Sequence, residues 1–479
     1  MTTFEKTEPI PVDAEQLYRW HARPGAFRRL VPPWQQIDVV DHEGGIEDGA
    51  RRRMKIHQGP LRLTWEAVHR DHIPGEQFVD EQVRGPFARW VHTHRFEQRE
   101  PGNSWLVDHV DYRLPFGRLG KWFGEAKTRR MLERMFAFRH RRTADDLRRH
   151  VATDRQMTVA ITGASGMIGS ALQAFLTTGG HRVIRLVRRR RDIDDDAIYW
   201  SPSTGEIDAE GLEGVDAVVH LAAENIDGRW TPAKRRAIED SRVRGTELLA
   251  KTLAELRDPP EVFASASGIG WYGDTGGETV DEGGGPGTGF LADVCRRWEE
   301  ATTPADAAGI RTLQLRLGVV LDPSGGALPK MLPAVRYGLA SRLGAGTQWM
   351  SWIDLDDAIG AILFVLTCDD LDGPVNLTAP QPVTNAELFE TMADIFRRPA
   401  VFPVPAPVVK LTAGPQTAEE TALISQQVAP KRLRDAGFSF FYPDVEQSLR
   451  TKLGFIPDTG RAPSMSLFAL TDPGLHGPR

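Results

Sequence analysis

Apolar and polar positions alternate with a period of two in several stretches of residues 1–150. The stretches "LRLTWEAVHRD", "QFVDEQVRG" and "ARWVHTHRFEQ" show this pattern, and turns such as "EPGN" separate them. Successive side chains of a strand point to opposite faces, so the pattern is typical of half-buried antiparallel strands. From Arg118 to about His150 the apolar positions recur with a helical period. The pattern predicts an antiparallel sheet that curls around one long helix.

A shorter helix is expected at "DAEQLYRW", directly after an opening strand. Asp13 stands at the N-cap position and Gln16 follows three residues later, which is the spacing of a capping box. We therefore expect the Asp13 side chain to accept a hydrogen bond from the first turn of this helix.

From residue 157 onward the pattern changes to alternating strands and helices. Apolar runs such as "TVAITGA" and "DAVVHLAA" lie between amphipathic segments such as "GSALQAFLTTG". Strands that are apolar throughout are buried on both faces, so this order predicts a parallel, doubly wound α/β sheet. Beyond about residue 320, Pro- and Gly-rich segments suit a smaller lobe that binds substrate. We expect the α/β unit over residues 157–400 and a C-terminal segment of the small lobe over 401–479.

Composition also separates the two parts of the chain. Its 479 residues are 41% hydrophobic and 26% charged, which is typical of a globular protein. Residues 1–150 contain 27 Lys and Arg against 22 Asp and Glu, whereas the remaining residues contain 32 against 43. Ten of the 13 histidines also lie in residues 1–150. These differences favour two modules of different composition.

The sequence argues against several classes of protein. No apolar run approaches the roughly 20 residues that span a bilayer, and the start "MTTFEKTEPI" is unlike a secretory signal. We therefore expect a cytoplasmic protein without a membrane span. Cys295 and Cys368 form neither a zinc-ligand spacing nor a disulfide framework. His92 and His94 share one strand face, but without a third ligand or a carboxylate partner they predict hydrogen-bonded sheet residues, and no metal is expected.

A glycine-rich turn provides the first candidate site. The stretch "TVAITGASGMIGSALQAFL" places Gly163, Gly166 and Gly169 between an apolar strand and an amphipathic helix. Gly163 permits a tight turn, Gly166 lets the backbone approach a pyrophosphate, and Gly169 allows close packing of helix on strand. The start of the helix supplies unpaired N–H groups and the positive end of its dipole. These features predict a dinucleotide site in a Rossmann-type fold.

The end of the second strand indicates which dinucleotide is bound. Enzymes that use NAD usually have an acidic residue there, whereas this chain reads "RLVRRRRD". Arg188 stands 25 residues after Gly163, where a ribose 2′-phosphate is expected, and a guanidinium pairs well with phosphate. We therefore predict NADP(H) as the cofactor. The arginines are followed at once by "DIDDD", which argues against nucleic acid as a partner.

The motifs together resemble the extended branch of the short-chain dehydrogenase/reductase superfamily. The spacing G-x-x-G-x-x-G and the segments "VVHLAA", "RVRGTELL", "SASGIGWYG" and "SWIDLDDAIGAI" carry this resemblance. It implies a site for hydride transfer in which Ser267 orients the substrate near the nicotinamide. It also implies a tyrosine, with a lysine four residues later, that moves the proton.

The helix that should carry this Tyr–Lys pair reads "GFLADVCRRWEEAT". The two positions fall on Leu291 and Cys295, or one residue earlier on Phe290 and Val294. Neither register supplies a tyrosine or a lysine. Tyr272 is then the remaining candidate proton donor, although the resemblance also allows it to be only a wall of the pocket.

The altered helix and the tail "ISQQVAPKRLRDAGFSFFYPDVEQSL" resemble an atypical extended family whose members are called epimerase family proteins, or NAD-dependent epimerase/dehydratase-like proteins. Some members have an additional domain in front. The order of elements in residues 1–150 resembles the α+β helix-grip fold of the SRPBCC, or START-like, superfamily. This resemblance implies an apolar ligand between sheet and helix, and the alternative is a structural or dimerising domain.

Two functions remain open. The first is an NADP(H)-dependent oxidoreductase or epimerase-like enzyme for a small or apolar carbonyl or hydroxyl compound, acting as a monomer or homodimer. The second is a non-catalytic protein that senses NADP(H) or binds a ligand. Ser267 and Tyr272 are the candidate catalytic residues. The residues expected to contact the cofactor are Gly163, Ser165, Gly166, Met167, Ile168, Arg188, Leu221, Ala222, Ala223 and Glu224.

Overall fold

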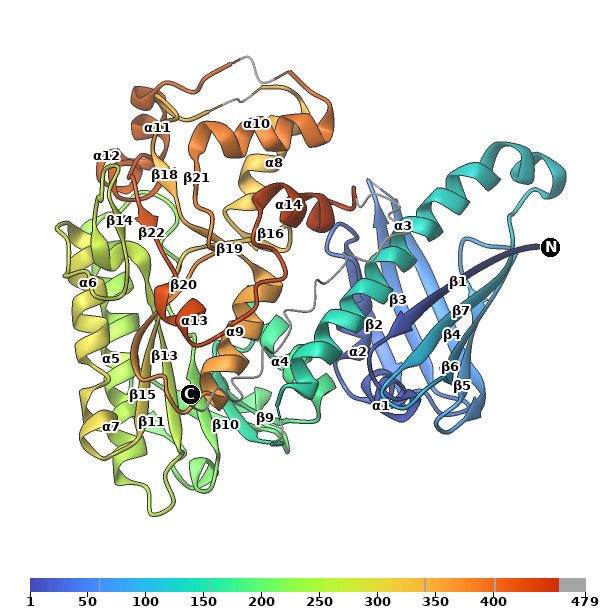
Figure 1. The fold of residues 1–479 in the computed structure, drawn as a ribbon, viewed down its shortest axis with the longest axis horizontal. Helices are drawn as coiled ribbons and strands as arrows, with labels where there is room; N and C mark the ends of the chain where they lie inside the picture. Colours follow the sequence, from blue (N-terminus) through green and yellow to red (C-terminus); the bar gives the residue numbers. More distant parts are fainter. Residues whose placement is uncertain (60, 154, 340–341, 400–401, 456–479) are drawn as a thin grey trace, which may run out of the picture.

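The structure is a computed structural model that describes residues 1–59, 61–153, 155–339, 342–399 and 402–455. Its first body, the front domain, lies on the right of Figure 1 and contains one antiparallel sheet in the order β1-β7-β6-β5-β4-β3-β2. The elements of the front domain are β1 (Thr2–Ile10), α1 (Ala14–Ala22), α2 (Ala26–Leu30), β2 (Ile37–Glu43), β3 (Arg51–Gln58), β4 (Leu61–Ile73), β5 (Gln77–Arg84), β6 (Arg89–Gln98), β7 (Ser104–Arg113) and α3 (Gly117–Val151).

The long helix α3 runs across the curled sheet (Figure 1). Leu132 and Phe136 of α3 are buried against Phe4, Val110 and Tyr112 of the sheet. The rings of Phe4 and Phe136 stack with their centres 5.4 Å apart. The expected α+β helix-grip arrangement is therefore confirmed.

The predicted capping box at the first helix is wrong. Asp13 does precede α1, but its side chain makes no hydrogen bond to the first turn. Its Oδ1 atom instead accepts hydrogen bonds from the Gln98 side chain at 3.0 Å and from the Gly102 backbone at 2.7 Å. Donors that are distant in sequence, Gln98 and Gly102, occupy the carboxylate in place of the first turn of α1. The spacing of Asp13 and Gln16 could not predict these distant donors.

The second body, the rear domain, is built on a sheet in the order β11-β10-β9-β8-β12-β13-β15-β20. All its strand pairs are parallel except β10 with β11. The elements of this sheet and its layers are β8 (Thr158–Thr162), α4 (Met167–Gly179), β9 (Arg182–Val187), β10 (Ala197–Ser201), β11 (Glu206–Ile207), β12 (Ala217–His220), α5 (Pro232–Glu255), β13 (Val262–Gly268), α6 (Phe290–Glu300), α7 (Thr303–Ala307), β15 (Arg311–Leu317), α9 (Leu355–Thr367) and β20 (Gly373–Leu377). The predicted doubly wound sheet is confirmed.

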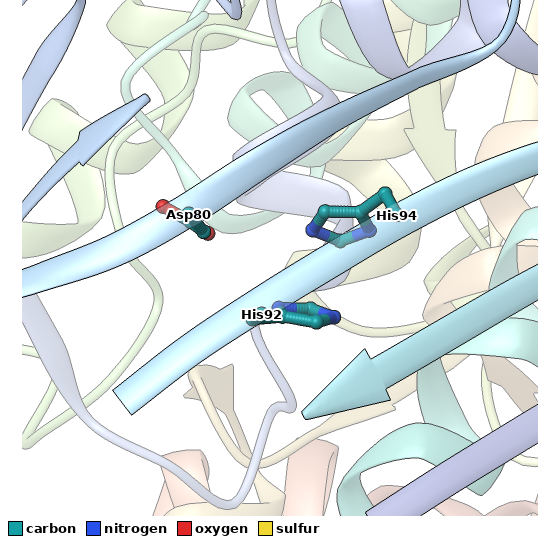
Figure 2. A group of neighbouring side chains, drawn as sticks. All are labelled: Asp80, His92 and His94. Atoms are coloured by element: carbon teal, nitrogen blue, oxygen red, sulfur yellow. The ribbon is translucent and has the colours of Figure 1, made fainter. Parts of the chain in front are cut away.

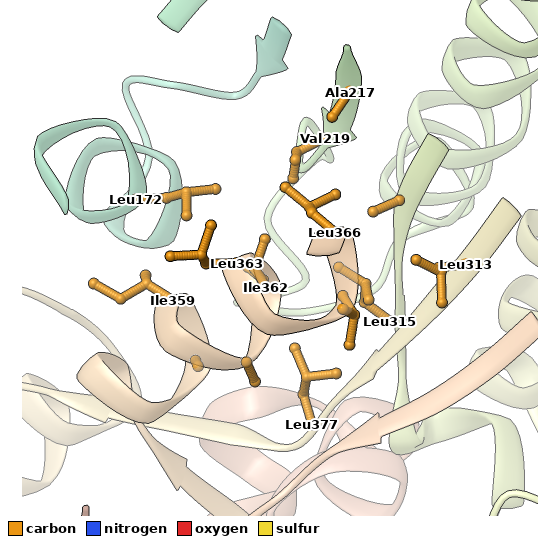
Figure 3. Packing of buried hydrophobic residues seen from close by; sticks show 14 of the residues in the cluster. Leu172, Ala217, Val219, Leu313, Leu315, Ile359, Ile362, Leu363, Leu366 and Leu377 are labelled. Carbon is orange, nitrogen blue, oxygen red and sulfur yellow. The ribbon is translucent and has the colours of Figure 1, made fainter. Parts of the chain in front are cut away.

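The interior of this sheet is aliphatic (Figure 3). Leu172 of α4 and Ile359, Leu363 and Leu366 of α9 pack against strand residues such as Val219. On the opposite face, α5 packs a second apolar cluster onto the sheet. Each fully buried aliphatic side chain contributes about 1.5–3 kcal/mol relative to exposure, so these layers hold the strand ends in place.

A smaller lobe follows and partly interleaves with this sheet. Its elements are β14 (Thr279–Val280), β16 (Val319–Asp322), β17 (Gly325–Gly326), α8 (Leu328–Arg336), β18 (Trp349–Met350), β19 (Trp352–Asp354), β21 (Val383–Thr384), α10 (Asn385–Phe396), α11 (Ala406–Ala413), α12 (Pro415–Thr417), β22 (Gln427–Val428), α13 (Lys431–Asp435) and α14 (Val445–Leu453). Strand β22 pairs with β14 in a separate two-stranded sheet, so the C-terminal segment lies beside the chain that follows β13. No helix among the described residues is both long and apolar enough to cross a membrane.

Buried ion pairs join the two bodies at the start of α9. Asp356 accepts from Arg29 of α2 at 3.0 Å and from Arg142 of α3 at 2.6 Å. Asp357 pairs with Arg149 of α3 at 2.5 Å. Arg29 also forms a double hydrogen bond with Asp146 of α3. Charges buried in this way are stable only when paired, so the front domain is fixed against α9, the helix that follows "SWID".

Candidate functional site

The glycine turn between β8 and α4 is dictated by close packing. Gly163 has a φ of +69°, and a Cβ atom there would lie 2.9 Å from the backbone nitrogen of Ala222. A Cβ atom on Gly169 would lie 2.3 Å from the carbonyl oxygen of Gly163. Neither position has room for a side chain, so the turn, the helix and the end of β12 are held in contact.

Gly166 has a different reason to be glycine. It is the N-cap of α4, and it is exposed together with Ser165. A Cβ atom there would contact only the Gly163 carbonyl oxygen, at 3.3 Å. The open side of Gly166 therefore leaves the first N–H groups of α4 accessible, as a pyrophosphate requires. Met167 and Ile168 begin the helix and are half-buried.

The end of β12 lies beside this turn because β8 and β12 are neighbouring parallel strands. The Thr162 hydroxyl accepts hydrogen bonds from the backbone of Leu221 and Ala222 at 3.0 and 3.1 Å. The sheet order reverses between these two strands, and in such sheets ligands bind outside this switch point. The next two residues, Ala223 and Glu224, are exposed.

Arg188 follows the end of β9, next to the glycine turn. Thr162 pairs with Leu186 in the parallel register, so Arg188 lies two residues beyond the last β8 partner. The next three arginines form ion pairs, Arg189 and Arg191 with Asp192, and Arg190 with Glu206. Arg188 is exposed and has no ion pair with any described residue. Its guanidinium is therefore available to an anion at this edge.

Ser267 and Tyr272 belong to one buried hydrogen-bond network. The Ser267 hydroxyl donates to Glu299 at 2.7 Å. Arg316 donates to both carboxylate oxygens of Glu299 at 2.8 Å and to the Tyr272 hydroxyl at 3.0 Å. The Tyr272 hydroxyl donates to Asn376 at 2.8 Å. Burial raises the pKa of Tyr272 against the opposing effect of Arg316.

Sequence reasoning missed Glu299, Arg316 and Asn376 as parts of this network. The register of β13, β15 and β20 aligns Ser267, Arg316 and Asn376 in one row across three strands. Arg316 stands inside an apolar strand and is 2% exposed, and a charged residue in such a strand was the one available signal. Asn376 gave no comparable signal because its role depends on the pairing of distant strands.

The helix expected to carry the Tyr–Lys pair is α6. Cys295 of α6 lies under the turn that follows β13, where a Cβ atom on Gly270 would meet its sulfur at 3.5 Å. Burial raises the pKa of Cys295 to about 11. The thiol is therefore protonated at neutral pH and is a poor nucleophile.

The front domain contains a group that we call the polar cluster, in which His69 and Asp80 are half-buried and the other members are buried: His21, His69, Asp80, His92, His94, Asp108 and His140. The sequence pattern predicted no metal because it placed no carboxylate near His92 and His94, and this premise is wrong. Asp108 lies 2.8 Å from His92 and 2.7 Å from His94. Asp80 is directly opposite His92 on the neighbouring strand.

Comparison with protein families divides the chain into three matched parts. Residues 10–136 match the family "Polyketide cyclase / dehydrase and lipid transport". Residues 159–377 match the NAD dependent epimerase/dehydratase family. Residues 404–451 match a domain of unknown function, DUF1731. These matches confirm the two resemblances seen in the sequence, to an SRPBCC-type domain in front and to an epimerase-like unit behind it.

Individual relatives extend this result. An epimerase family protein of Mycobacterium bovis is 43% identical over 292 residues, which are 61% of this chain and 96% of that protein. A crystal structure of a nucleoside-diphosphate sugar epimerase from Corynebacterium glutamicum has a TM-score of 0.78 and 33% identity, over 94% of this chain and 90% of that one. The human epimerase family protein SDR39U1, solved with NADPH, has a TM-score of 0.57 and 30% identity, over 63% of this chain and all of that one. The chain therefore belongs to the family whose members are called epimerase family proteins.

Proposed function

We propose that the rear domain binds NADP(H) at the crevice between β8 and β12. One observation carries this proposal. The guanidinium of Arg188 pairs with no described carboxylate, and it lies beside the exposed start of α4. The human relative that was solved with NADPH supports the choice of the phosphorylated cofactor. In this arrangement Gly163, Ser165, Gly166, Met167 and Ile168 line the pyrophosphate side. Leu221, Ala222, Ala223 and Glu224 line the adenosine side.

We further propose that the protein is an oxidoreductase or epimerase-like enzyme for a small or apolar carbonyl or hydroxyl compound. The bound cofactor supplies a hydride or accepts one. The chain has to move the accompanying proton, and Ser267 and Tyr272 are the hydroxyl groups at the end of β13. Arg316 and Glu299 connect these two hydroxyl groups through hydrogen bonds. The charge of Arg316 beside the Tyr272 hydroxyl favours loss of the proton from that hydroxyl.

A second candidate function is non-catalytic recognition of NADP(H). The observation that favours it is the burial of both hydroxyl groups, since Ser267 is 3% exposed and Tyr272 is 5% exposed. Both also donate their hydrogen bonds within the protein, to Glu299 and to Asn376. In this function the front domain recognises an apolar ligand and the rear domain reports the state of the NADP(H) pool.

Binding is tested by titrating the full chain with NADPH, NADP⁺, NADH and NAD⁺ in a calorimeter. We expect Arg188→Ala to weaken NADPH binding about 10- to 100-fold, because a charge-assisted hydrogen bond contributes about 1.5–3 kcal/mol. NADH binding should change little. Arg189→Ala is the matched control, because Arg189 already pairs with Asp192. If the wild type binds none of the four dinucleotides, both candidate functions fail.

Turnover separates the two functions once binding is established. NADPH oxidation is followed at saturating cofactor with a panel of aldehydes and ketones, for the wild type and for Tyr272→Phe. The enzyme proposal expects activity in the wild type and a loss of about 100-fold in kcat for Tyr272→Phe, as is typical for removal of a general acid. Binding without oxidation of any compound favours the sensing function. Equal activity of Tyr272→Phe shows that the Tyr272 hydroxyl does not donate the proton.

A further inference from the structure

The register of the front sheet brings together the strand residues of the polar cluster, while His21 and His140 come from α1 and α3. His69 of β4 is opposite Asp80 of β5, and Asp80 is opposite His92 of β6. One pair further along, His94 of β6 is opposite Asp108 of β7. Directly opposed side chains on one face are about 4.5–5.5 Å apart at Cβ, so these rows bring imidazoles and carboxylates into contact.

Three members of the cluster, Asp80, His92 and His94, lie close to one another on neighbouring strands (Figure 2). Asp80, His92 and His94 each offer a ligand atom, and these three atoms all lie within 4.8 Å of one another. His92 and His94 are buried, with 2% and 6% of their surface exposed. The Asp80 side chain, directly opposite His92, is 31% exposed. An ion can therefore approach the three residues from the side of Asp80.

Asp108 holds the His92 ring in an orientation that suits a metal ligand. Its carboxylate lies 2.8 Å from Nε2 of His92 and 2.5 Å from Nε2 of His140. When a carboxylate accepts the proton of one ring nitrogen, the other nitrogen of that imidazole presents its lone pair.

His94 provides a second indication. Its Nδ1 atom lies 2.7 Å from Oδ1 of Asp108, yet this buried nitrogen has no hydrogen-bond partner among the described residues. The two atoms therefore approach closely in a geometry that is poor for a hydrogen bond. A buried polar atom without a partner is costly, and a cation beside it would remove that cost.

We propose that Asp80, His92 and His94 bind one divalent transition-metal ion inside the front domain, and that Asp108 is the positioning residue behind the His92 ring. Two imidazoles and one carboxylate suit Zn²⁺ and Fe²⁺. Three protein ligands also leave a coordination position open for water or for a ligand of the front domain. This site lies in a different domain from the proposed NADP(H) site and does not depend on it.

A polar core that is held only by hydrogen bonds is the alternative to this proposal. His69 lies 3.2 Å from Oδ1 of Asp80, and a charged His69 could neutralise that carboxylate without a metal. The carboxylate has a second oxygen, so the contact with His69 and a bond to the ion are compatible. Only a binding measurement separates the two interpretations.

The test uses the full chain, freed of metal by dialysis against a chelator and then titrated with ZnCl₂. We expect one equivalent of Zn²⁺ to bind, and we expect His92→Gln and Asp80→Asn to weaken binding by about 100-fold or more. Asp108→Asn should weaken it about 10- to 100-fold, because it removes a residue behind the ligands rather than a ligand. The matched control is His109→Gln on β7, a half-exposed histidine that pairs with Glu5 at 2.9 Å.

Failure to bind Zn²⁺ in the wild type, or equal affinity in wild type, His92→Gln and Asp80→Asn, overturns the proposal. If these variants do not fold, the absorption spectrum of the Co²⁺-loaded wild type decides the question. We expect d–d bands without a thiolate-to-cobalt band, since both cysteines lie outside the front domain. A thiolate band, or absence of d–d bands, places the ion elsewhere and overturns the proposal. Fe²⁺ in place of ZnCl₂ shows which of the two ions binds more tightly.

Discussion

In the front domain, the strand residues of the polar cluster lie on the sheet face that packs against α1 and α3. The rear sheet meets α4 and α9 through leucine, isoleucine and valine side chains (Figure 3). Both interiors are buried, but they are stabilised differently. The rear interior gains free energy from apolar burial. In the front interior, each imidazole and carboxylate has to find a partner to offset the cost of losing water. A polar interior is therefore a weak source of stability and a better indication of function.

We expect the largest effect on stability from a substitution of Asp108, in the interior of the front domain. Although burial opposes ionisation, His94 and His140 hold the pKa of Asp108 well below its usual range. The carboxylate is therefore charged at neutral pH. Asp108→Asn removes this charge from the histidines around it and should lower the free energy of unfolding by about 4 kcal/mol. Urea denaturation of the metal-free chain measures this loss.

The location of the effect is checked by hydrogen exchange. We expect peptides from β6 and β7 to lose protection in Asp108→Asn, while peptides from β8 and α4 keep theirs. Asp111→Asn is the matched control, because Asp111 lies in the same strand, is half-exposed and accepts a hydrogen bond from Thr3 at 2.8 Å. If Asp111→Asn loses as much stability as Asp108→Asn, the polar cluster contributes no more to stability than a half-exposed carboxylate does.

The rear interior should respond to loss of volume rather than loss of charge. Leu363 of α9 is 2% exposed and packs in the aliphatic cluster. Leu363→Ala removes buried methyl groups and leaves a cavity, so we expect a loss of about 3 kcal/mol in the free energy of unfolding. Leu411→Ala is the control, since Leu411 is 74% exposed and its loss should cost less than about 0.5 kcal/mol. Equal losses in the two variants contradict the comparison.

The same difference explains how much of the fold the sequence predicted. Apolar runs and glycine spacing are local signals, and they were sufficient for the doubly wound sheet and for the turn at Gly163. The alternating strands and the long helix were sufficient for the helix-grip arrangement. The capping box at Asp13 failed because Gln98 and Gly102, far along the chain, compete for the same carboxylate.

The parts of the sites that sequence reasoning missed depend on strand register. Arg316 meets Ser267 and Asn376 only because three parallel strands align them. Asp80 and Asp108 reach His92 and His94 only through the pairing of β5, β6 and β7. A one-residue change of register would turn each of these side chains to the other face. No local pattern fixes that register, so the carboxylate partners of the histidines could not be predicted.

The smallest effect concerns a titratable ring inside the rear domain, His220 at the end of β12. Its Nδ1 atom lies 2.7 Å from the Thr162 hydroxyl, and burial lowers its pKa to about 3. The unfolded chain binds a proton at this histidine below a pH of about 6.5, whereas the folded chain does not. The stabilising effect is therefore present above pH 6.5 and is lost as the pH falls toward 3.

Between pH 7 and pH 5 we expect His220 to account for a loss of about 2 kcal/mol in the free energy of unfolding. Urea denaturation at both pH values, for the wild type and for His220→Gln, measures this contribution. The glutamine side chain of this variant can still hydrogen-bond to Thr162 but does not titrate, so the variant should lose less stability on acidification than the wild type does. If both proteins lose the same amount, His220 is not held neutral by the rear core. The acid sensitivity of the chain then resides in other groups, with the polar cluster of the front domain the first to examine.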